Sequence, residues 1–115
     1  MKSVTVLLST YNGEKYIREQ LESLSKQSSI GNFQVLIRDD GSTDKTVEII
    51  EAYADKYNFV KLTKGRNIGY INSFFELIKN ADYSDYYALC DQDDVWNSDK
   101  LSSAIKMLQE ENANI

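Results

Sequence analysis

Val4-Thr5-Val6-Leu7-Leu8-Ser9, near the start of the 115-residue chain, decides the fold class. The run is aliphatic and β-branched, a pattern typical of a strand that is buried in a sheet. A turn signal at Asn12-Gly13 ends the run. Residues 14 to about 26 then carry apolar side chains at helical spacing, which predicts an amphipathic helix. A buried strand followed at once by a helix is how a parallel α/β fold begins.

The same alternation continues along the chain. Strand-like runs occupy residues 33–38, 59–63 and 86–90, and the continuous apolar run of the last predicts another buried strand. Helical periodicity follows each run, with apolar positions at Val47, Ile50, Ala54, Tyr57, Ile71, Phe74, Phe75, Ile78, Leu101, Ala104, Ile105 and Leu108. The pattern predicts an α/β fold, Rossmann-like, with three α/β/α layers around a mostly parallel sheet. Residues 1–115 are expected to form a single domain.

Composition excludes several classes of function. The chain has no histidine, which excludes histidine metal ligands and a histidine general base, and its one cysteine excludes a disulfide scaffold. A net charge of −5 argues against binding to nucleic acid or to an anionic membrane surface. No apolar run approaches the ~20 residues that span a bilayer, and a signal peptide is not evident. We therefore expect a cytoplasmic protein that reaches the inner face of a membrane only through parts outside this sequence.

Polar clusters follow three of the predicted strands. They are Thr10-Tyr11-Asn12, Asp39-Asp40-Gly41-Ser42 and Asp91-Gln92-Asp93-Asp94. The carboxyl ends of parallel strands meet at one edge of a sheet, where such folds bind their ligands. Asp, Asn, Ser and Gly are also common in loops and helix caps, which is the alternative for any one cluster. Three clusters at one edge favour a binding site.

Asp91-Gln92-Asp93-Asp94 is the most informative of these clusters. Its three carboxylates repel one another unless a cation or hydrogen-bond donors compensate. Oxygen ligands suit Mg²⁺ or Mn²⁺, which proteins commonly hold with one or two carboxylates plus substrate phosphates. The sequence therefore predicts a divalent metal site here, and the alternative is a solvated acidic turn that caps the next helix.

The other polar segments suggest contacts to a nucleotide. Asp39 and Asp40 could accept hydrogen bonds from a base or a ribose; alternatively, Asp39 pairs with Arg38 or Lys45 while Ser42 or Asp44 caps the next helix. Tyr11 offers a ring face for stacking. The glycine-bounded segment 65–69 has neither P-loop nor dinucleotide-fingerprint spacing. Arg66 or Lys64 could contact a phosphate, but the favoured role of the segment is a tight turn before the next helix, with Asn67 at the pocket floor.

Taken together, four motifs resemble family 2 glycosyltransferases of the GT-A fold, which use nucleotide-diphosphate sugars. The motifs are Ser9-Thr10-Tyr11-Asn12-Gly13, Asp39-Asp40-Gly41-Ser42-Thr43-Asp44, Asn67-Ile68-Gly69 and Asp91-Gln92-Asp93-Asp94-Val95-Trp96. Their order and spacing fit along essentially the whole chain. The last motif is similar to that of rhamnosyltransferase-type members that build bacterial surface polysaccharides.

The resemblance implies roles for individual residues. The first-strand turn and the paired carboxylates would contact the nucleoside, Asp91 would lie near the ribose, and Asp93 would bind the divalent cation with Asp91 and Asp94 beside it. Arg66 or Asn67 would complete the nucleoside pocket. The residues expected to bind the nucleotide sugar are Ser9, Thr10, Tyr11, Asn12, Asp39, Asp40, Arg66, Asn67, Asp91 and Gln92.

The resemblance also implies a reaction and a partner set. The donor would be a UDP- or dTDP-sugar, the acceptor a saccharide or a lipid-linked molecule, and the transfer inverting with Mn²⁺ or Mg²⁺. Such enzymes place their general base well downstream of the acidic motif, so we expect it beyond Ile115 and expect this chain to be the donor-binding part of a longer, truncated protein. Alternatives are a non-catalytic nucleotide- or metal-binding module and, less favoured because the acidic motif follows the fourth strand, a phosphohydrolase of the haloacid dehalogenase type.

Overall fold

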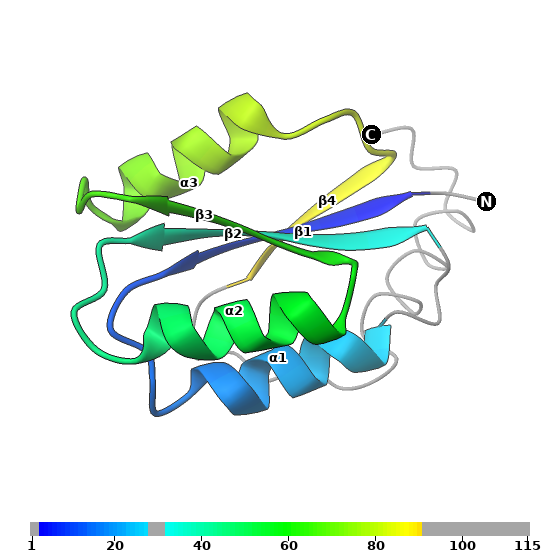
Figure 1. Cartoon of the computed structure of the whole chain (residues 1–115). Helices are drawn as coiled ribbons and strands as arrows, with labels where there is room; N and C mark the ends of the chain where they lie inside the picture. The colour runs from blue at the N-terminus through cyan, green and yellow to red at the C-terminus, as the bar shows by residue number, and fades with distance from the viewer. Residues whose placement is uncertain (1–2, 28–31, 91–115) are drawn as a thin grey trace.

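The computed structural model describes residues 3–27 and 32–90 of the chain. Helices and strands alternate along these residues (Figure 1), in the order β1 (Val4–Thr10), α1 (Ile17–Ser25), β2 (Phe33–Asp40), α2 (Thr46–Lys56), β3 (Val60–Gly65), α3 (Tyr70–Asn80) and β4 (Tyr86–Cys90). The predicted alternation is confirmed over this part of the chain. The predicted helix that contains Leu101 lies outside the described residues.

The four strands form one parallel sheet in the order β3-β2-β1-β4. The central pair β1 and β2 is in register from Val4 opposite Phe33 to Thr10 opposite Asp39. Helices α1 and α2 lie on one face of the sheet, and α3 lies on the other (Figure 1). The predicted three-layer α/β/α architecture with a parallel sheet is therefore confirmed.

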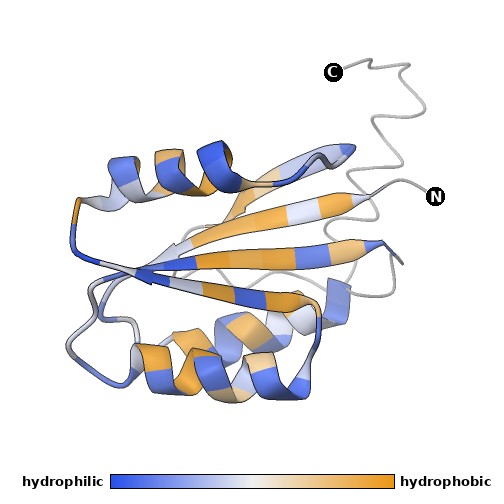
Figure 2. Cartoon of the chain, turned by 45° about the horizontal axis from the view of Figure 1, so that its top comes forward, coloured by the Kyte–Doolittle hydropathy of each residue, from blue (hydrophilic) through white to orange (hydrophobic). Residues whose placement is uncertain are grey.

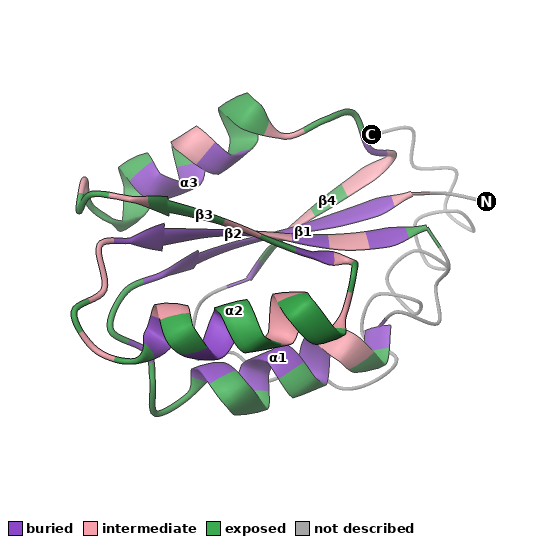
Figure 3. Ribbon diagram, viewed as in Figure 1, coloured by how far each residue is buried: buried purple, intermediate pink, exposed green. Residues whose placement is uncertain are grey.

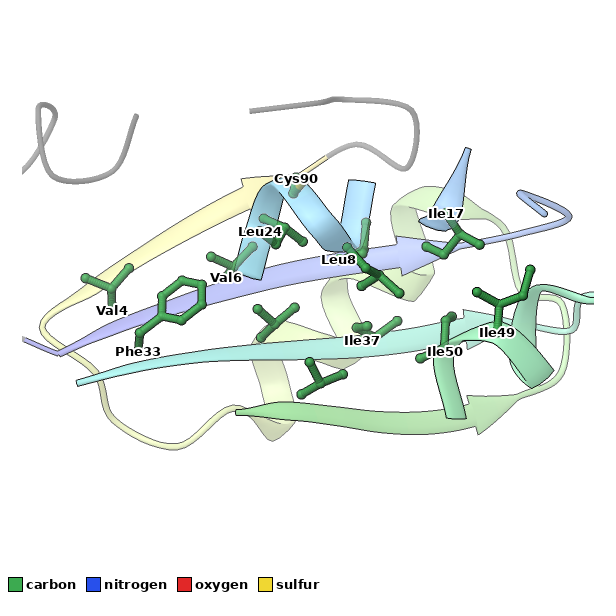
Figure 4. Close-up of a cluster of buried hydrophobic side chains, with 13 residues drawn as sticks. Val4, Val6, Leu8, Ile17, Leu24, Phe33, Ile37, Ile49, Ile50 and Cys90 are labelled. Carbon is green, nitrogen blue, oxygen red and sulfur yellow. The ribbon is translucent and has the colours of Figure 1, made fainter. Parts of the chain in front are cut away.

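The main hydrophobic core lies between the sheet and helices α1 and α2 (Figure 4). Side chains alternate across a strand, so every second residue of β1 and β2 faces this layer. Ile17, Leu24 and Ile50 supply the helical side of the core. All seven residues of β1 are buried, as the sequence predicts for a strand covered on both faces. This core holds the carboxyl-terminal ends of the strands in fixed positions.

The opposite face has a smaller hydrophobic core. Leu7 packs there against Phe74 and Leu77 of α3. The apolar side chains that mark this helix in the sequence are only partly used in packing (Figure 3), because Ile71 is 64% exposed and Phe75 is 63% exposed. The helix is confirmed, but its buried face is centred on Phe74 and Leu77.

Strand β4 is less buried than predicted. Cys90 is fully buried, whereas Tyr87 is 47% exposed and Leu89 is 60% exposed. Leu89 pairs with Leu7 and so shares the α3 face of the sheet. Among the described residues, α3 packs mainly over β1 and β2, so it covers this side of β4 only in part. The prediction of a buried strand is wrong for these two side chains.

Several element boundaries differ from those predicted. Asp39 and Asp40 are the last two residues of β2 and Gly65 ends β3, so residues expected in loops belong to strands. Helix α1 begins at Ile17 because the chain first makes a turn, in which the Gly13 carbonyl accepts hydrogen bonds from the N–H groups of residues 16 and 17. Within the described residues, no helix is both long enough and apolar enough to cross a bilayer.

Candidate functional site

The described polar residues that the sequence singles out gather at the carboxyl-terminal ends of the strands. Figure 2 shows the middle of each central strand as hydrophobic and the ends of β1, β2 and β3 as polar. Thr10 lies opposite Asp39 in the β1–β2 register, and Asp40 lies opposite Gly65 in the β2–β3 register. The register therefore places the described motifs side by side at one edge, as predicted.

Asp39 organises the part of this edge that faces α1 and α2. The Thr10 hydroxyl donates to Asp39 Oδ1 at 2.8 Å, and the Ser42 hydroxyl donates to the same oxygen at 2.6 Å. The backbone N–H of Ser42 donates to Oδ2 at 2.8 Å. With only 2% of its surface exposed, Asp39 fixes the turn that follows β2 against the end of β1.

The turns after β1 and β2 are also tied directly to each other. The N–H of Asn12 donates to the Ser42 hydroxyl at 2.9 Å, and the N–H of Thr43 donates to Asn12 Oδ1 at 2.8 Å. Asn12 has a φ of 48°, in the left-handed region where Asn is better tolerated than most residues. The Gly13 N–H donates to the Thr46 hydroxyl at 2.8 Å. The two turns therefore form one hydrogen-bonded unit.

Asp44 fixes the start of α2 within this unit. Its Oδ1 accepts from the N–H of Thr46 at 2.9 Å and from the Thr46 hydroxyl, while Oδ2 accepts from the N–H of Glu14 at 3.2 Å. Burial by itself raises the pKa of Asp44, but these hydrogen bonds outweigh burial and lower the pKa below 3.8. Asp44 is therefore an ionised acceptor at neutral pH, occupied by protein donors.

Asp40 organises the part of the edge that faces α3. The Arg38 Nη1 donates to Asp40 Oδ1 at 2.7 Å, in an ion pair whose side chains are 9% and 3% exposed. The N–H groups of Ile68 and Gly69 donate to the two carboxylate oxygens at 2.9 and 3.1 Å. The alternative in which Asp39 pairs with Arg38 is wrong, because alternate residues of a strand share a face and Arg38 therefore meets Asp40.

The turn after β2 and the segment after β3 touch at Gly41. This glycine has a φ of 82°, and a Cβ placed on it would lie 2.9 Å from the backbone nitrogen of Asn67. A side chain at position 41 would thus both strain the backbone and push the two segments apart. The close approach brings Asn67 next to the turn that Asp39 holds.

The described candidate residues differ strongly in accessibility. Ser9, Thr10, Asp39 and Asp40 are each at most 8% exposed, whereas Tyr11 is 44% exposed. Asn12, Arg66 and Asn67 are also exposed. The buried carboxylates hold backbone segments in place, and the exposed side chains are presented to solvent at the same edge.

The acidic motif lies outside the described residues. Asp91, Gln92, Asp93 and Asp94 all belong to it, so their predicted roles stay predictions. The strand that precedes them is described, and its last residue, Cys90, pairs with Leu8 near the same edge of the sheet. Within residues 3–27 and 32–90 no group of three or more acidic or cysteine side chains is arranged to hold a metal ion.

Sequence reasoning missed two residues that shape this edge, Thr46 and Ser73, and it named Arg38 only as an alternative partner of Asp39. Arg38 and Ser73 lie on the α3 side, where Arg38 Nη1 donates to the Ser73 hydroxyl at 3.0 Å. One signal was present, since a charged residue at the end of the apolar run of β2 is costly to bury without a partner. Ser73 carries no comparable signal, because its partners Ser9 and Arg38 are distant in sequence. Thr46 lies two residues from its partner Asp44, but its contact with Gly13 joins residues that are distant in sequence.

Comparisons with known proteins identify the family. The model of "Glycosyl transferase family 2" matches residues 5–115. A dTDP-rhamnosyl transferase, RfbG, from Shigella flexneri is 38% identical over 93% of this chain and 38% of its own length. The poly(ribitol-phosphate) beta-N-acetylglucosaminyltransferase TarS from Staphylococcus aureus is 32% identical over 100% of this chain and 20% of its own length. The chain thus spans well under half of either relative.

Solved structures agree with this assignment. Residues 1–349 of S. aureus TarS in complex with UDP-GlcNAc match with a TM-score of 0.83 and 35% identity, over 94% of this chain and 31% of that one. A mannosyltransferase from Pyrobaculum calidifontis, in complex with GDP-Man and Mn²⁺, also has a TM-score of 0.83, at 25% identity over 93% of this chain and 32% of that one. The fold is that of GT-A glycosyltransferase domains, and the chain belongs to glycosyl transferase family 2.

Proposed function

We propose that the protein transfers a sugar from a UDP- or dTDP-activated donor to a saccharide or lipid-linked acceptor in bacterial cell-surface polysaccharide synthesis. Membership of family 2 supports the reaction class. The relatives support the donor class, because one is a dTDP-rhamnosyl transferase and another was solved with UDP-GlcNAc. Residues 1–115 are the donor-binding part of this enzyme.

The observation that carries the proposal is the pair of buried carboxylates at the sheet edge. Asp39 holds the turns after β1 and β2, and Asp40 holds segment 66–69, so three segments border one site before any ligand arrives. Preorganisation of this kind lowers the entropy cost of binding. Tyr11, Arg66 and Asn67 then offer exposed groups to the nucleotide. The Oδ2 atom of each carboxylate accepts only one of the hydrogen bonds that hold these segments, so Asp39 and Asp40 keep acceptor capacity there for a base or ribose donor.

The metal part of the proposal depends on residues 91–94. The described carboxylates of Asp39, Asp40 and Asp44 are engaged by protein donors, which makes them poor candidates for cation ligands. We assign Asp93 to Mn²⁺ or Mg²⁺, with Asp91 and Asp94 in support and Gln92 near the nucleotide. A divalent cation in that position supplies Lewis-acid stabilisation to a departing diphosphate.

The transfer itself is a displacement at the anomeric carbon with inversion. The acceptor oxygen forms the new glycosidic bond as the bond to the nucleoside diphosphate breaks, and a general base takes the acceptor proton. We expect this base beyond Ile115. The 115-residue chain by itself is therefore expected to bind donor nucleotide without transferring sugar, and detection of transfer by it would contradict this expectation.

A thermal-shift panel of UDP-, dTDP- and GDP-sugars with and without Mn²⁺ tests the donor assignment. A ligand at 100 times its Kd stabilises a native protein by about 2.7 kcal/mol, which is readily measured as a rise in Tm. We expect Tm to rise with a UDP- or dTDP-sugar, and to rise further when Mn²⁺ is also present. If Tm stays unchanged with every member of the panel, the proposal is contradicted.

The metal assignment has a separate test by calorimetry. Asp93→Asn should abolish the metal-linked part of nucleotide affinity, because a neutral amide is a weak ligand for a hard cation. Asp55→Asn removes an exposed carboxylate from α2 and is the matched control, with affinity expected to be unchanged. Equal metal-linked affinity in Asp93→Asn and the unmodified chain would show that the assignment is wrong.

A further inference from the structure

Arg38 is a buried cation on the α3 face of the sheet. The residue is 8% exposed, close to the apolar layer formed by Leu7 and Leu77. Removing a guanidinium from water costs several kcal/mol unless partners compensate. Such a group persists in a native structure only when its hydrogen bonds and charge are matched, so its partners indicate what it holds in place.

The partners of Arg38 come from three different elements. Nη1 donates to Asp40 of β2 at 2.7 Å and to the Ser73 hydroxyl of α3 at 3.0 Å. Nη2 donates to the backbone carbonyl of Arg66 at 3.1 Å. The Ser9 hydroxyl of β1 in turn donates to Ser73 at 2.6 Å. The planar guanidinium therefore joins β2, α3 and the segment after β3, and Ser73 links this group to β1.

Segment 66–69 is held at both of its ends by this arrangement. Arg38 binds the carbonyl of Arg66 directly, and Asp40 binds the N–H groups of Ile68 and Gly69. Gly69 is the N-cap of α3, so the Asp40 carboxylate also lies where the helix dipole favours negative charge. Asn67, which lies between these two attachment points, is left exposed at the edge of the sheet.

Gly65 supplies the space that the guanidinium occupies. A Cβ placed on Gly65 would lie 2.2 Å from Arg38 Nη2 and 2.8 Å from Cζ. No native contact is that short, so a residue with a side chain would displace the guanidinium. Gly65 and Arg38 are thus matched to each other in adjacent strands.

We propose that Arg38 is a positioning residue for the donor site. Through Asp40 and the Arg66 carbonyl it sets the conformation of segment 66–69, and it thereby presents Asn67 to the nucleotide. The proposal rests on the proposed function for its ligand. It differs from a purely structural role, in which Arg38 would stabilise the fold without affecting nucleotide affinity through Asn67.

The first experiment compares Arg38→Met, Arg38→Lys and the control Lys61→Met in the 115-residue chain. Lys61 is an exposed cation on β3, so its removal changes net charge equally without touching segment 66–69. We expect Arg38→Met to weaken UDP or dTDP binding in the presence of Mn²⁺ by about tenfold, because misplaced binding groups lose that much or more. Lysine cannot reproduce the fork of the guanidinium, so Arg38→Lys should be intermediate, and Lys61→Met unchanged.

A double-mutant cycle with Asn67→Ala separates positioning from stability. If Arg38 acts through Asn67, the loss of nucleotide affinity caused by Arg38→Met should largely disappear in the Asn67→Ala background. The same loss in both backgrounds overturns the proposal. If Arg38→Met does not fold, Arg38→Lys replaces it in the same cycle.

Amide hydrogen exchange gives a readout that needs no nucleotide. The N–H groups of Ile68 and Gly69 should exchange faster in Arg38→Lys than in Lys61→Met, because their acceptor Asp40 is no longer held by the guanidinium. Unchanged exchange overturns the positioning role. If the unmodified chain binds neither UDP nor dTDP, the proposed function is contradicted instead. In that case the exchange rates by themselves still test whether Arg38 positions segment 66–69.

Discussion

Among residues 3–27 and 32–90, α1 and α2 enclose a core of 13 buried residues on one face of the sheet, whereas α3 covers a core of Leu7, Phe74 and Leu77 on the other. The first face is closed by apolar contact along the length of the strands. The second combines its small apolar core with the buried polar contacts of Arg38 and Asp40 at one end. We infer that the first face supplies most of the stability. The second face uses part of its interior for polar contacts that hold segment 66–69 in position.

The largest expected effect tests the first face. Ile50→Ala removes a fully buried side chain from α2 and should lower the free energy of unfolding by about 2–5 kcal/mol. Urea denaturation followed by circular dichroism measures the change. Ile78→Ala is the matched control on α3, where the side chain is 52% exposed, and it should stay within about 0.5 kcal/mol of the unmodified chain. Equal losses in the two variants would remove the distinction between the faces.

An intermediate effect tests the second face. Gly65→Ala should cost about 1–3 kcal/mol of stability, since the new methyl group displaces the Arg38 guanidinium from a packed site. In an Arg38→Ala background the same substitution should cost much less, because the clashing group is gone. Equal costs in both backgrounds, measured by urea denaturation, would mean that the guanidinium does not occupy the space beside Gly65.

The smallest effect concerns a polar contact between the two helices of the first face. Burial, followed by the 2.6 Å hydrogen bond that its hydroxyl donates to Glu22, raises the pKa of Tyr53 to about 12 from 10.0. The folded state therefore favours the protonated phenol, and its contribution to stability is complete below pH 10 and is lost as the pH rises through about 12. Unfolding curves between pH 9 and pH 12 should show a shallower decline for Tyr53→Phe than for the unmodified chain. Parallel declines would contradict the raised pKa.

The same contrast explains what the sequence could predict. Apolar patterning identified every described helix and strand, because the spacing of apolar residues differs between helices and strands. It placed the candidate residues at one edge, because parallel strands fix where their ends meet. It overestimated the burial of Leu89 and Phe75, since the pattern shows that a side chain is apolar but not whether another element covers it.

The polar contacts of the site were harder to predict for a different reason. Arg38, Ser73 and Arg66 are far apart in the sequence and meet only after the sheet and α3 have packed. Whether Arg38 pairs with Asp39 or Asp40 depends on which face of β2 each residue occupies. The strand predicted from the sequence ended at residue 38, before either carboxylate. Extending β2 by two residues settles the pairing.

Asp39 and Asp40 are neighbours in the chain, but they serve opposite layers of the molecule. The two side chains point to opposite faces of the sheet because side-chain direction alternates with a two-residue period along an extended strand. A deletion or insertion of one residue in β2 would send each carboxylate to the other's side, even with every residue type preserved. The length of β2 is therefore as much a determinant of this site as the identity of its acids, and homologous sequences should tolerate substitutions in this strand far better than changes in its length.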